Sequence, residues 1–333
     1  MNSYLLGAAL AAASLASLFT GAMDVTLSQI LAGDAAALQV LLASRLPRLL
    51  AVLMTGAGMS IAGLVMQQLC ANKFVSPTTG ATIASAQLGI LLSFAFLPAS
   101  TLLSRTFCAF GAALAGTLAF ASFALRARLK DPVMVPLIGI MFSSVINGLT
   151  SLLAFSLDMT QALSTWAVGH FSLIVRGHYE MVFLVAPLTL LAWVYARHFN
   201  IVGLGRDFAS SLGVSYRRVL LGGLMISAAI TASVVSVAGV IPYIGLVVPN
   251  IISIWKGDDL RNTLCDTALF GALFVLACDL VARLAIAPYE LPVELVTGTV
   301  GSVVFIALIF RRLGLKSLGK LFRRSPAGTG GAA

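Results

Sequence analysis

Long apolar runs separated by short polar breaks follow one another along almost the whole chain of 333 residues. A helix needs roughly 20 apolar residues to cross the hydrocarbon core of a bilayer, and these runs have about that length. The pattern predicts an all-α polytopic membrane protein with about ten transmembrane helices. We place them at residues 4–22, 47–69, 81–98, 101–125, 133–156, 181–198, 218–239, 241–256, 265–286 and 294–311.

The two ends of the chain are interpreted separately. The first apolar run, Tyr4 to Met23, lacks the basic segment that begins a signal peptide and is followed by further spans, so we expect it to be the first helix. The Gly- and Ala-rich stretch at 325–333 has no periodicity and is predicted to be a disordered tail. Residues 1–324 are expected to form one transmembrane domain.

Composition excludes a soluble globular protein, because 59% of the residues are hydrophobic and only 10% are charged. A net charge of +9 would suit nucleic acid. However, the basic residues are scattered through short loops and have no aromatic platform beside them, which argues against that partner. Membrane topology explains the charge better.

The basic residues are distributed unevenly between the two sides of the predicted membrane domain. With the N-terminus in the cytoplasm, only five of the 21 Lys and Arg residues fall outside: Arg45, Arg48, Arg105, Arg176 and Arg283. This bias follows the positive-inside rule, and an odd number of spans would destroy it. The charges therefore favour an even number of spans, with both termini in the cytoplasm.

Two of the predicted helices are rich in small residues, which let neighbouring backbones approach closely in lipid. They are Gly56, Gly58, Ser60 and Gly63 in one helix, and Gly222, Gly223, Ser227, Ala228 and Ala229 in the other. The segments leading into these helices, SRLPRLL at 44–50 and SYRRVLL at 215–221, are weakly alike. An inverted internal repeat would produce this likeness, and so would chance.

Few residues in the chain could carry chemistry. The phosphate-binding pattern GxxxxGK[ST] is missing from the sequence, and no soluble stretch could fold a nucleotide-binding domain, so any ATPase must be another chain. Cys70, Cys108, Cys265 and Cys278 lack metal-ligand spacing and are interpreted as buried packing residues. We expect no metal, no disulfide and no cofactor. A membrane enzyme would need a polar cluster that the sequence does not contain.

An ion-coupled secondary transporter is the main alternative to an ATP-driven permease. Such carriers place titratable groups at mid-membrane, whereas the one clear intramembrane carboxylate here is Asp279. Arg283 lies four residues later on the same helical face, which favours a structural ion pair. Co-purification with an ATPase would separate the two classes.

The longest internal cytoplasmic loop runs from Gly205 to Arg218. Gly213 in this loop could end one short helix and let a second begin. The loop is then either a helix-turn-helix knob that fits a cleft on a partner protein or an ordinary amphipathic linker.

Several short motifs, taken together in order and spacing, resemble the FecCD/BtuC-like family of ABC importer permeases, which serve iron-siderophore and cobalamin uptake. The resemblance covers nearly the whole chain. Its motifs are RLPR at 45–48, MQQ at 66–68 followed by Asn72 and Pro77, the segment 209–213, GLVVP at 245–249, and Asp279 to Arg283 with ELP at 290–292.

The resemblance implies a type II importer permease fold. It also implies two permease subunits around a central pathway, two cytoplasmic ATPase subunits and a periplasmic or lipid-anchored binding protein in the bacterial inner membrane. Motif by motif, it assigns binding-protein docking to Arg45, Arg48 and Arg283, and a cytoplasmic gate to Asn72 and Phe74. It assigns ATPase coupling to a pair of helices over 205–217, with Gly205, Arg206, Asp207, Ala209, Leu212, Gly213 and Arg217 as the residues involved.

The sequence departs from the family pattern at two places. Many members begin the inner gate loop with Asn-Pro and have Pro-His after the Gly-Leu-Val run, whereas this chain has NKFVSP at 72–77 and Pro249-Asn250. Both variants resemble permeases for ferric catecholate-type siderophores, and they argue against cobalamin by analogy alone. A permease of the same family for cobalamin or haem stays an alternative. Ser143, Ser144 and Asn147 either line the pathway or bond helix to helix. Which siderophore is carried, and whether the two permease subunits are identical, stays open.

Overall fold

The computed structural model describes residues 3–21, 26–77, 81–97, 101–126, 134–177, 179–287 and 289–313. The predicted tail at 325–333 lies outside these residues. Helices dominate the described chain, and its only β contacts are isolated bridges. The helices are α1 (Ser3–Phe19), α2 (Leu27–Leu31), α3 (Ala35–Val40), α4 (Leu46–Leu69), α5 (Thr82–Phe96), α6 (Leu102–Arg126), α7 (Met134–Ser156), α8 (Thr160–Ala167), α9 (Val185–Gly203), α10 (Arg206–Ser211), α11 (Tyr216–Ala238), α12 (Ile244–Lys256), α13 (Leu260–Leu284) and α14 (Val293–Leu313).

An apolar helix occupies each of the ten predicted positions, which confirms the fold class. However, only seven helical segments in the described chain are long and apolar enough to cross a membrane, so the expectation of ten full-length spans is corrected. The shorter apolar helices are α1, α5 and α12. Helix α12 spans only about 20 Å at about 1.5 Å per residue, because the chain before it, from Gly239 to Tyr243, is not helical.

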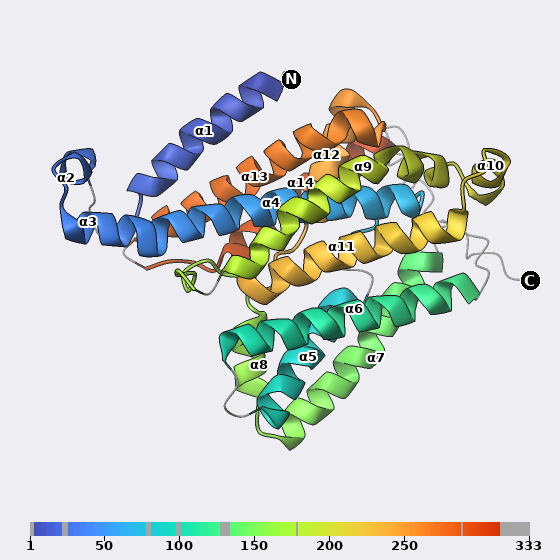
Figure 1. Cartoon of the computed structure of the whole chain (residues 1–333), viewed down its shortest axis with the longest axis horizontal. Helices are drawn as coiled ribbons and strands as arrows, with labels where there is room; N and C mark the ends of the chain where they lie inside the picture. The colour runs from blue at the N-terminus through green and yellow to red at the C-terminus, as the bar shows by residue number, and fades with distance from the viewer. Residues whose placement is uncertain are drawn as a thin grey trace, which may run out of the picture.

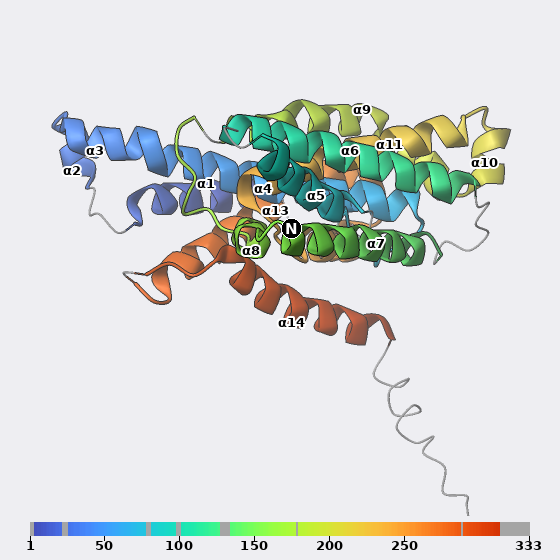
Figure 2. The ribbon, with the colours of Figure 1, turned by 90° about the horizontal axis from the view of Figure 1, so that it is seen from below.

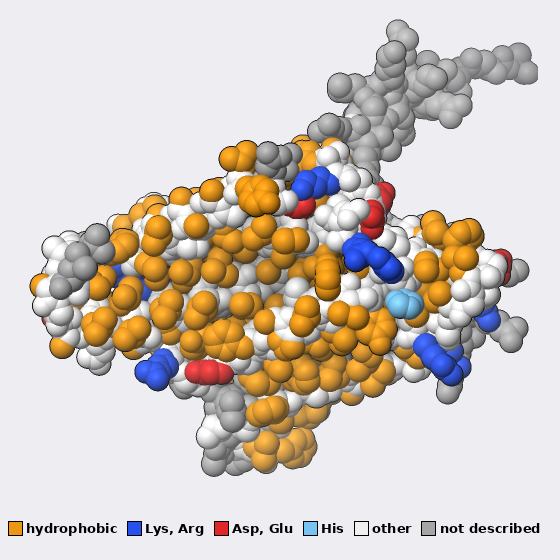
Figure 3. Space-filling view, turned by 45° about the horizontal axis from the view of Figure 1, so that its top comes forward, with side chains coloured by type: hydrophobic (Ala, Val, Ile, Leu, Met, Phe, Trp, Pro, Cys, Tyr) orange, Lys and Arg blue, Asp and Glu red, His pale blue; other side chains and the backbone are white. Residues whose placement is uncertain are grey.

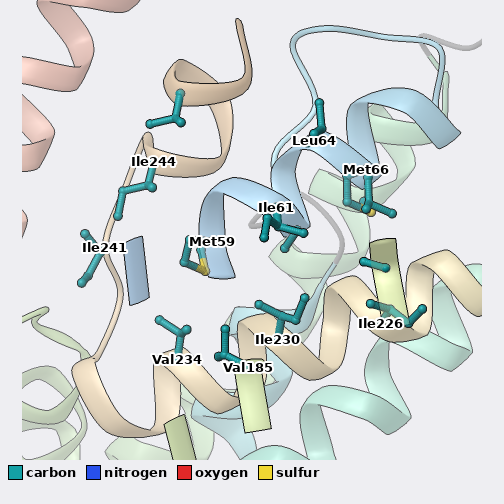
Figure 4. Packing of buried hydrophobic residues seen from close by; sticks show 14 of the residues in the cluster. Met59, Ile61, Leu64, Met66, Val185, Ile226, Ile230, Val234, Ile241 and Ile244 are labelled. Atoms are coloured by element: carbon teal, nitrogen blue, oxygen red, sulfur yellow. The ribbon is translucent and has the colours of Figure 1, made fainter. Parts of the chain in front are cut away.

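Helix α4 is the central element of the fold. It packs against α13, α11, α12 and α9, and it runs through the middle of the bundle (Figure 1). Its apolar residues, among them Met59 and Ile61, form the main core with Ile230 of α11 and Ile244 of α12 (Figure 4). Because neighbouring helices cover most of its surface, α4 fixes the positions of the loops at both of its ends.

Small residues let α4 approach its neighbours at backbone distance, as the sequence predicts. A side chain on Gly63 would overlap the Gly245 carbonyl oxygen of α12, and one on Gly56 would overlap the Gly271 carbonyl oxygen of α13. On α11, Gly223 packs against Leu69, but a side chain on Gly222 would meet nothing within 4 Å. The expectation that Gly222 lies on a packing face is therefore wrong.

Helices α5, α6 and α7 form a second group beside α11 (Figure 1). A small second core lies where α5 and α6 pack against α11. Helix α14 contacts α12 and α13 and leads away from the rest of the bundle (Figure 2). Hydrophobic side chains cover most of the face drawn in Figure 3. Such a surface suits lipid or another apolar protein surface.

The helices separate two ends of the molecule. The loop end comprises residues 70–77, 203–216 and 256–259, where Lys73 pairs with Asp258 at 2.7 Å and Lys256 donates to Ser3 of α1. The arginine end comprises Arg45, Arg48 and Arg283. The segments 44–50 and 215–221 lead into α4 and α11 from opposite ends, as an inverted repeat requires, although the repeat itself stays a prediction.

Candidate functional site

The loop after α4 is held by side-chain hydrogen bonds. Asn72 Oδ1 accepts a hydrogen bond from the backbone N–H of Phe74 at 2.9 Å, which closes a tight turn. The Phe74 side chain is 50% exposed, and its ring meets the edge of Phe305 on α14, with 6.0 Å between the ring centroids. The two residues predicted to form a gate therefore lie between α4 and α14.

Helix α12 lacks one backbone hydrogen bond near its start, and a side chain of α4 supplies a donor in its place. Pro249 has no N–H, so the Gly245 carbonyl oxygen lacks its normal helix donor. Gln67 Nε2 supplies a donor to that oxygen at 3.3 Å, from the buried face of α4. Asn250 Nδ2 donates to the Lys73 carbonyl oxygen at 2.8 Å, which ties α12 to the loop.

These contacts bring together three motifs that are far apart in the sequence: MQQ at 66–68, the loop at 72–77 and GLVVP at 245–249. Sequence analysis assigned no role to Gln67 or Asn250. The signal that could have found Gln67 is a buried amide facing a helix that contains an internal proline.

The segment 205–217 contains one short helix, α10, and the first turn of α11, rather than two separate short helices. Its turn is closed by the N–H of Gly213, which donates to Ser210 O at 3.0 Å, and by the N–H of Val214, which donates to Ala209 O at 2.9 Å. Gly213 has φ +73°, a left-handed conformation that favours glycine.

The knob formed by α10 and its flanking turns has both buried and exposed residues, and Val214 in its second turn packs against the main core. Ala209 is fully buried, whereas Leu204, Phe208 and Leu212 are about half-exposed or more. The charged members of the predicted set, Arg206, Asp207 and Arg217, are exposed as well. Three large apolar side chains spaced four residues apart at one tip give the surface that a partner protein would cover.

At the opposite end, the structure brings two of the three predicted arginines, Arg48 and Arg283, to one buried carboxylate. Asp279 Oδ1 accepts from Arg48 at 2.8 Å, and Asp279 Oδ2 accepts from Arg283 at 2.6 Å. The predicted pair between Asp279 and Arg283 is confirmed. Sequence analysis missed Arg48 as a second partner, and it missed Glu290, which binds Arg48 at 2.8 Å.

A docking surface requires exposed side chains, but two of the three arginines are buried. Arg45 and Arg283 are 8% and 7% exposed. Arg45 donates to Leu18 O at 2.6 Å, and Arg283 donates to Thr20 O at 3.0 Å, so both bind the end of α1. The physical reason is that backbone acceptors at the end of α1, together with Asp279, satisfy these guanidinium groups inside the bundle.

Residues singled out on α7 lie on an outer face. Ser144 and Asn147 are exposed and Ser143 is partly exposed, beside large exposed residues such as Val145 and Leu149. Ser144 donates to Ile140 O of its own helix at 2.9 Å, so it does not bond helix to helix here.

The cysteines and acidic residues suggest no metal centre. In the part of the chain that the structure describes, no group of three His, Cys, Asp or Glu residues is arranged to hold a metal ion. Cys70 and Cys278 are buried as expected, but Cys265 is exposed, so its interpretation as a buried packing residue is wrong.

Residues 9–311 match the FecCD transport family. The chain is 42% identical over 272 residues to the petrobactin import system permease protein YclN of Bacillus subtilis, covering 82% of this chain and 86% of that protein. It is 38% identical over 296 residues to the ferric-anguibactin transport system permease protein FatD of Vibrio anguillarum, covering 89% and 94%. A solved structure described as an inward-facing conformation of a metal-chelate type ABC transporter matches with a TM-score of 0.82 at 25% identity, covering 93% and 98%.

Proposed function

This chain belongs to the FecCD transport family, and from that membership we propose that it is the membrane-spanning subunit of an ATP-driven importer for a ferric siderophore. The observation that carries the proposal is the family match over residues 9–311, supported by relatives named for petrobactin import and ferric-anguibactin transport. The chain itself makes and breaks no bond. It provides the route across the bilayer, and ATP is hydrolysed by a separate pair of subunits.

The proposed orientation places the loop end in the cytoplasm. The support is the excess of Lys and Arg in the loops assigned to that side, together with the presence of Ser3 and α10 at the same end. Both termini are then cytoplasmic, in the inner membrane of a bacterial cell. The arginine end faces outward, toward a periplasmic or lipid-anchored binding protein.

A second permease subunit, identical or homologous, completes the pathway. The support is the outer face of α7, where Leu152 and Phe155 are 68% and 80% exposed, and that of α14, where Val303 is 64% exposed. Ser143, Ser144 and Asn147 add polar groups to the same α7 helix and are proposed to line the route.

The knob formed by α10 and its flanking turns, residues 204–217, is proposed to insert into the ATPase subunits. Its exposed Leu204, Phe208 and Leu212 would be buried there, while Ala209 holds the knob to the bundle. Bound in a cleft, such a compact element transmits motion as a rigid body.

Replacing Gly213 by Val is expected to abolish ATPase stimulation and uptake while leaving the bundle folded. A β-branched side chain is strained at φ +73°, and the substitution therefore distorts the turn between α10 and α11. The measurement is ATP hydrolysis and uptake of radioactive ferric siderophore by proteoliposomes that contain permease, ATPase and loaded binding protein.

Gly33 offers a matched control, because it also has positive φ and open space around it but lies between α2 and α3, which are far from α10 (Figure 1). Gly33→Val should keep ATPase stimulation. Equal loss of activity in both variants, or full activity of Gly213→Val, would contradict the coupling role. Uptake of cobalamin but not of any ferric siderophore would overturn the proposed substrate.

Asn72 and Phe74 are proposed to restrict the cytoplasmic mouth. The support is the tight turn that Asn72 closes and the contact of Phe74 with α14. Cysteine substituted at either position is expected to change its rate of modification by a membrane-impermeant maleimide when ATP is added, since opening separates the loop from α14.

Native cysteines could also react with the maleimide and obscure the signal from the introduced cysteine. Cys265 is exposed and must be replaced by Ser. Cys70 can stay, because burial raises the pKa of its thiol to about 12 and leaves little reactive thiolate. The Cys265→Ser protein without an added cysteine is the control. Identical modification rates with and without ATP would contradict the gate.

Docking of the binding protein is proposed for the arginine end, with Arg45, Arg48 and Arg283 as its charged centre. The support is their convergence at one end and the exposure of Glu290, whose side chain is 29% exposed and binds Arg48. Arg48 thus reaches the surface, whereas Arg45 and Arg283 are buried beneath it. When an arginine binds a carboxylate of the binding protein through two hydrogen bonds, the contact fixes the orientation of the partner and also adds charge attraction.

A further inference from the structure

A groove of about 640 Å³ lies between α9 and α11, at the loop end. It extends from the turn at Gly213 along both helices to Leu191 and Ile226. Both helices belong to segments that are long and apolar enough to cross the membrane, Glu180–Gly203 and Tyr216–Ala238. The groove therefore starts at the headgroup level and continues into the hydrocarbon layer. The distance from Ser215 to Ile226 along the helix is about 16 Å, which suits part of an acyl chain.

The inner half of the groove is apolar and unfilled by the protein. Leu191, Met225 and Ile226 line it, and Phe199 closes its base. Gly222 leaves this stretch of α11 without a side chain, and an added Cβ would meet no atom within 4 Å. A helix glycine that no neighbouring helix uses for close packing leaves free space beside α11.

The outer half of the groove is cationic. Arg218 and His198 line it and are exposed, and no acidic residue is among the lining residues. Within the described chain, neither side chain forms a hydrogen bond or an ion pair. The Tyr195 ring lies beside that of His198 in a tilted arrangement, with 5.7 Å between the ring centroids, and tyrosine is enriched at the membrane interface. Two unpaired donors above an apolar channel make an amphipathic site.

We propose that this groove binds an anionic phospholipid, with its phosphate at Arg218 and His198 and one acyl chain over Gly222. Basic pockets between transmembrane helices recognise such headgroups, whereas a soluble anion would gain nothing from the apolar half. Gly213, Val214 and Ser215 belong to both the groove and the knob. Bound lipid would touch the turn between α10 and α11. The binding itself does not depend on the proposed function.

Native mass spectrometry of the detergent-extracted protein, titrated with dioleoyl phosphatidylglycerol or dioleoyl phosphatidylcholine, tests the proposal. Wild-type protein should retain phosphatidylglycerol more tightly than phosphatidylcholine. Arg218→Gln should weaken phosphatidylglycerol binding roughly fivefold, as expected for one interfacial arginine, and change phosphatidylcholine binding little. Gly222→Leu should remove the site for both lipids while leaving the melting temperature unchanged, because the new side chain fills empty space.

Matched controls are Arg261→Gln, which removes an exposed charge at the loop end, and Gly111→Leu, which fills open space on α6. Both should bind lipid as the wild type does. Unchanged lipid retention in Arg218→Gln and Gly222→Leu would overturn the proposal. Displacement of the lipid by inorganic phosphate alone would also overturn it. A third contradicting result would be that Arg218→Gln and Gly222→Leu both lose the co-purifying ATPase but still retain lipid. The groove would then be a binding site for the ATPase.

Discussion

Replacing Asp279 by Ala is expected to destabilise the protein by about 3–5 kcal/mol, the usual result of removing one partner from a buried ion pair. The Asp279 side chain is fully buried, and it holds Arg48 from α4 and Arg283 from its own helix. Without it, two guanidinium groups lose their shared acceptor. The expected readout is a large fall in the melting temperature of the detergent-extracted protein, measured by loss of the monodisperse chromatographic peak.

Glu290→Gln is the matched control, because it removes the second carboxylate that binds Arg48 but does so at the surface. Its side chain is 29% exposed, and such pairs contribute only about 0–1 kcal/mol. The melting temperature should change little. If Arg48 docks a carboxylate of the binding protein, Glu290→Gln should also speed association at low salt, because the competing internal carboxylate is gone. If both variants destabilised the protein equally, the burial of Asp279 would not make its ion pairs more important for stability than the exposed pair of Glu290.

The arginine end shows where prediction from sequence stops. The pair of Asp279 and Arg283 could be predicted, because residues four apart on a helix share a face. Arg48 is 231 residues from Asp279, and no local pattern marks that contact. The burial of Arg45 and Arg283 could not be predicted either, because both side chains donate to backbone carbonyls at the end of α1, and such acceptors carry no sequence signature. Charge reversal of these arginines would therefore test folding together with docking.

The loop end was predictable in outline but not in detail. Apolar run lengths locate the helices, and Gly213 marks the turn after α10. The start of α12 was not predictable, because no polar residue interrupts the chain between Val240 and Val248, and its first residues differ from a helix only in backbone conformation. Nor could sequence separate Gly222 from Gly223. They are neighbours in one small-residue stretch, and packing alone decides that Gly223 meets Leu69 while Gly222 faces open space.

Replacing Gly63 by Leu is expected to prevent folding of the bundle. Any side chain there would overlap the backbone carbonyl of Gly245, which no rotamer change can move. Adding a few methylene groups to a packed core lowers the free energy of unfolding by about 1–3 kcal/mol when the surrounding side chains can adjust. Here the cost must be larger, because α4 and α12 have to separate as whole helices. Their separation would also break the bond from Gln67 to the Gly245 carbonyl, to which Pro249 cannot donate because it lacks an N–H.

The check is the yield of monodisperse protein after detergent extraction, compared with Gly111→Leu on α6, where an added side chain meets no atom within 4 Å. The two variants add the same apolar volume to a transmembrane helix, so lipid partitioning cannot distinguish them. Gly111→Leu should extract normally and Gly63→Leu should aggregate. Gly63→Ala should already lower the melting temperature, because the overlap begins at Cβ. Normal extraction of Gly63→Leu would mean that α4 and α12 do not cross at backbone distance in the membrane.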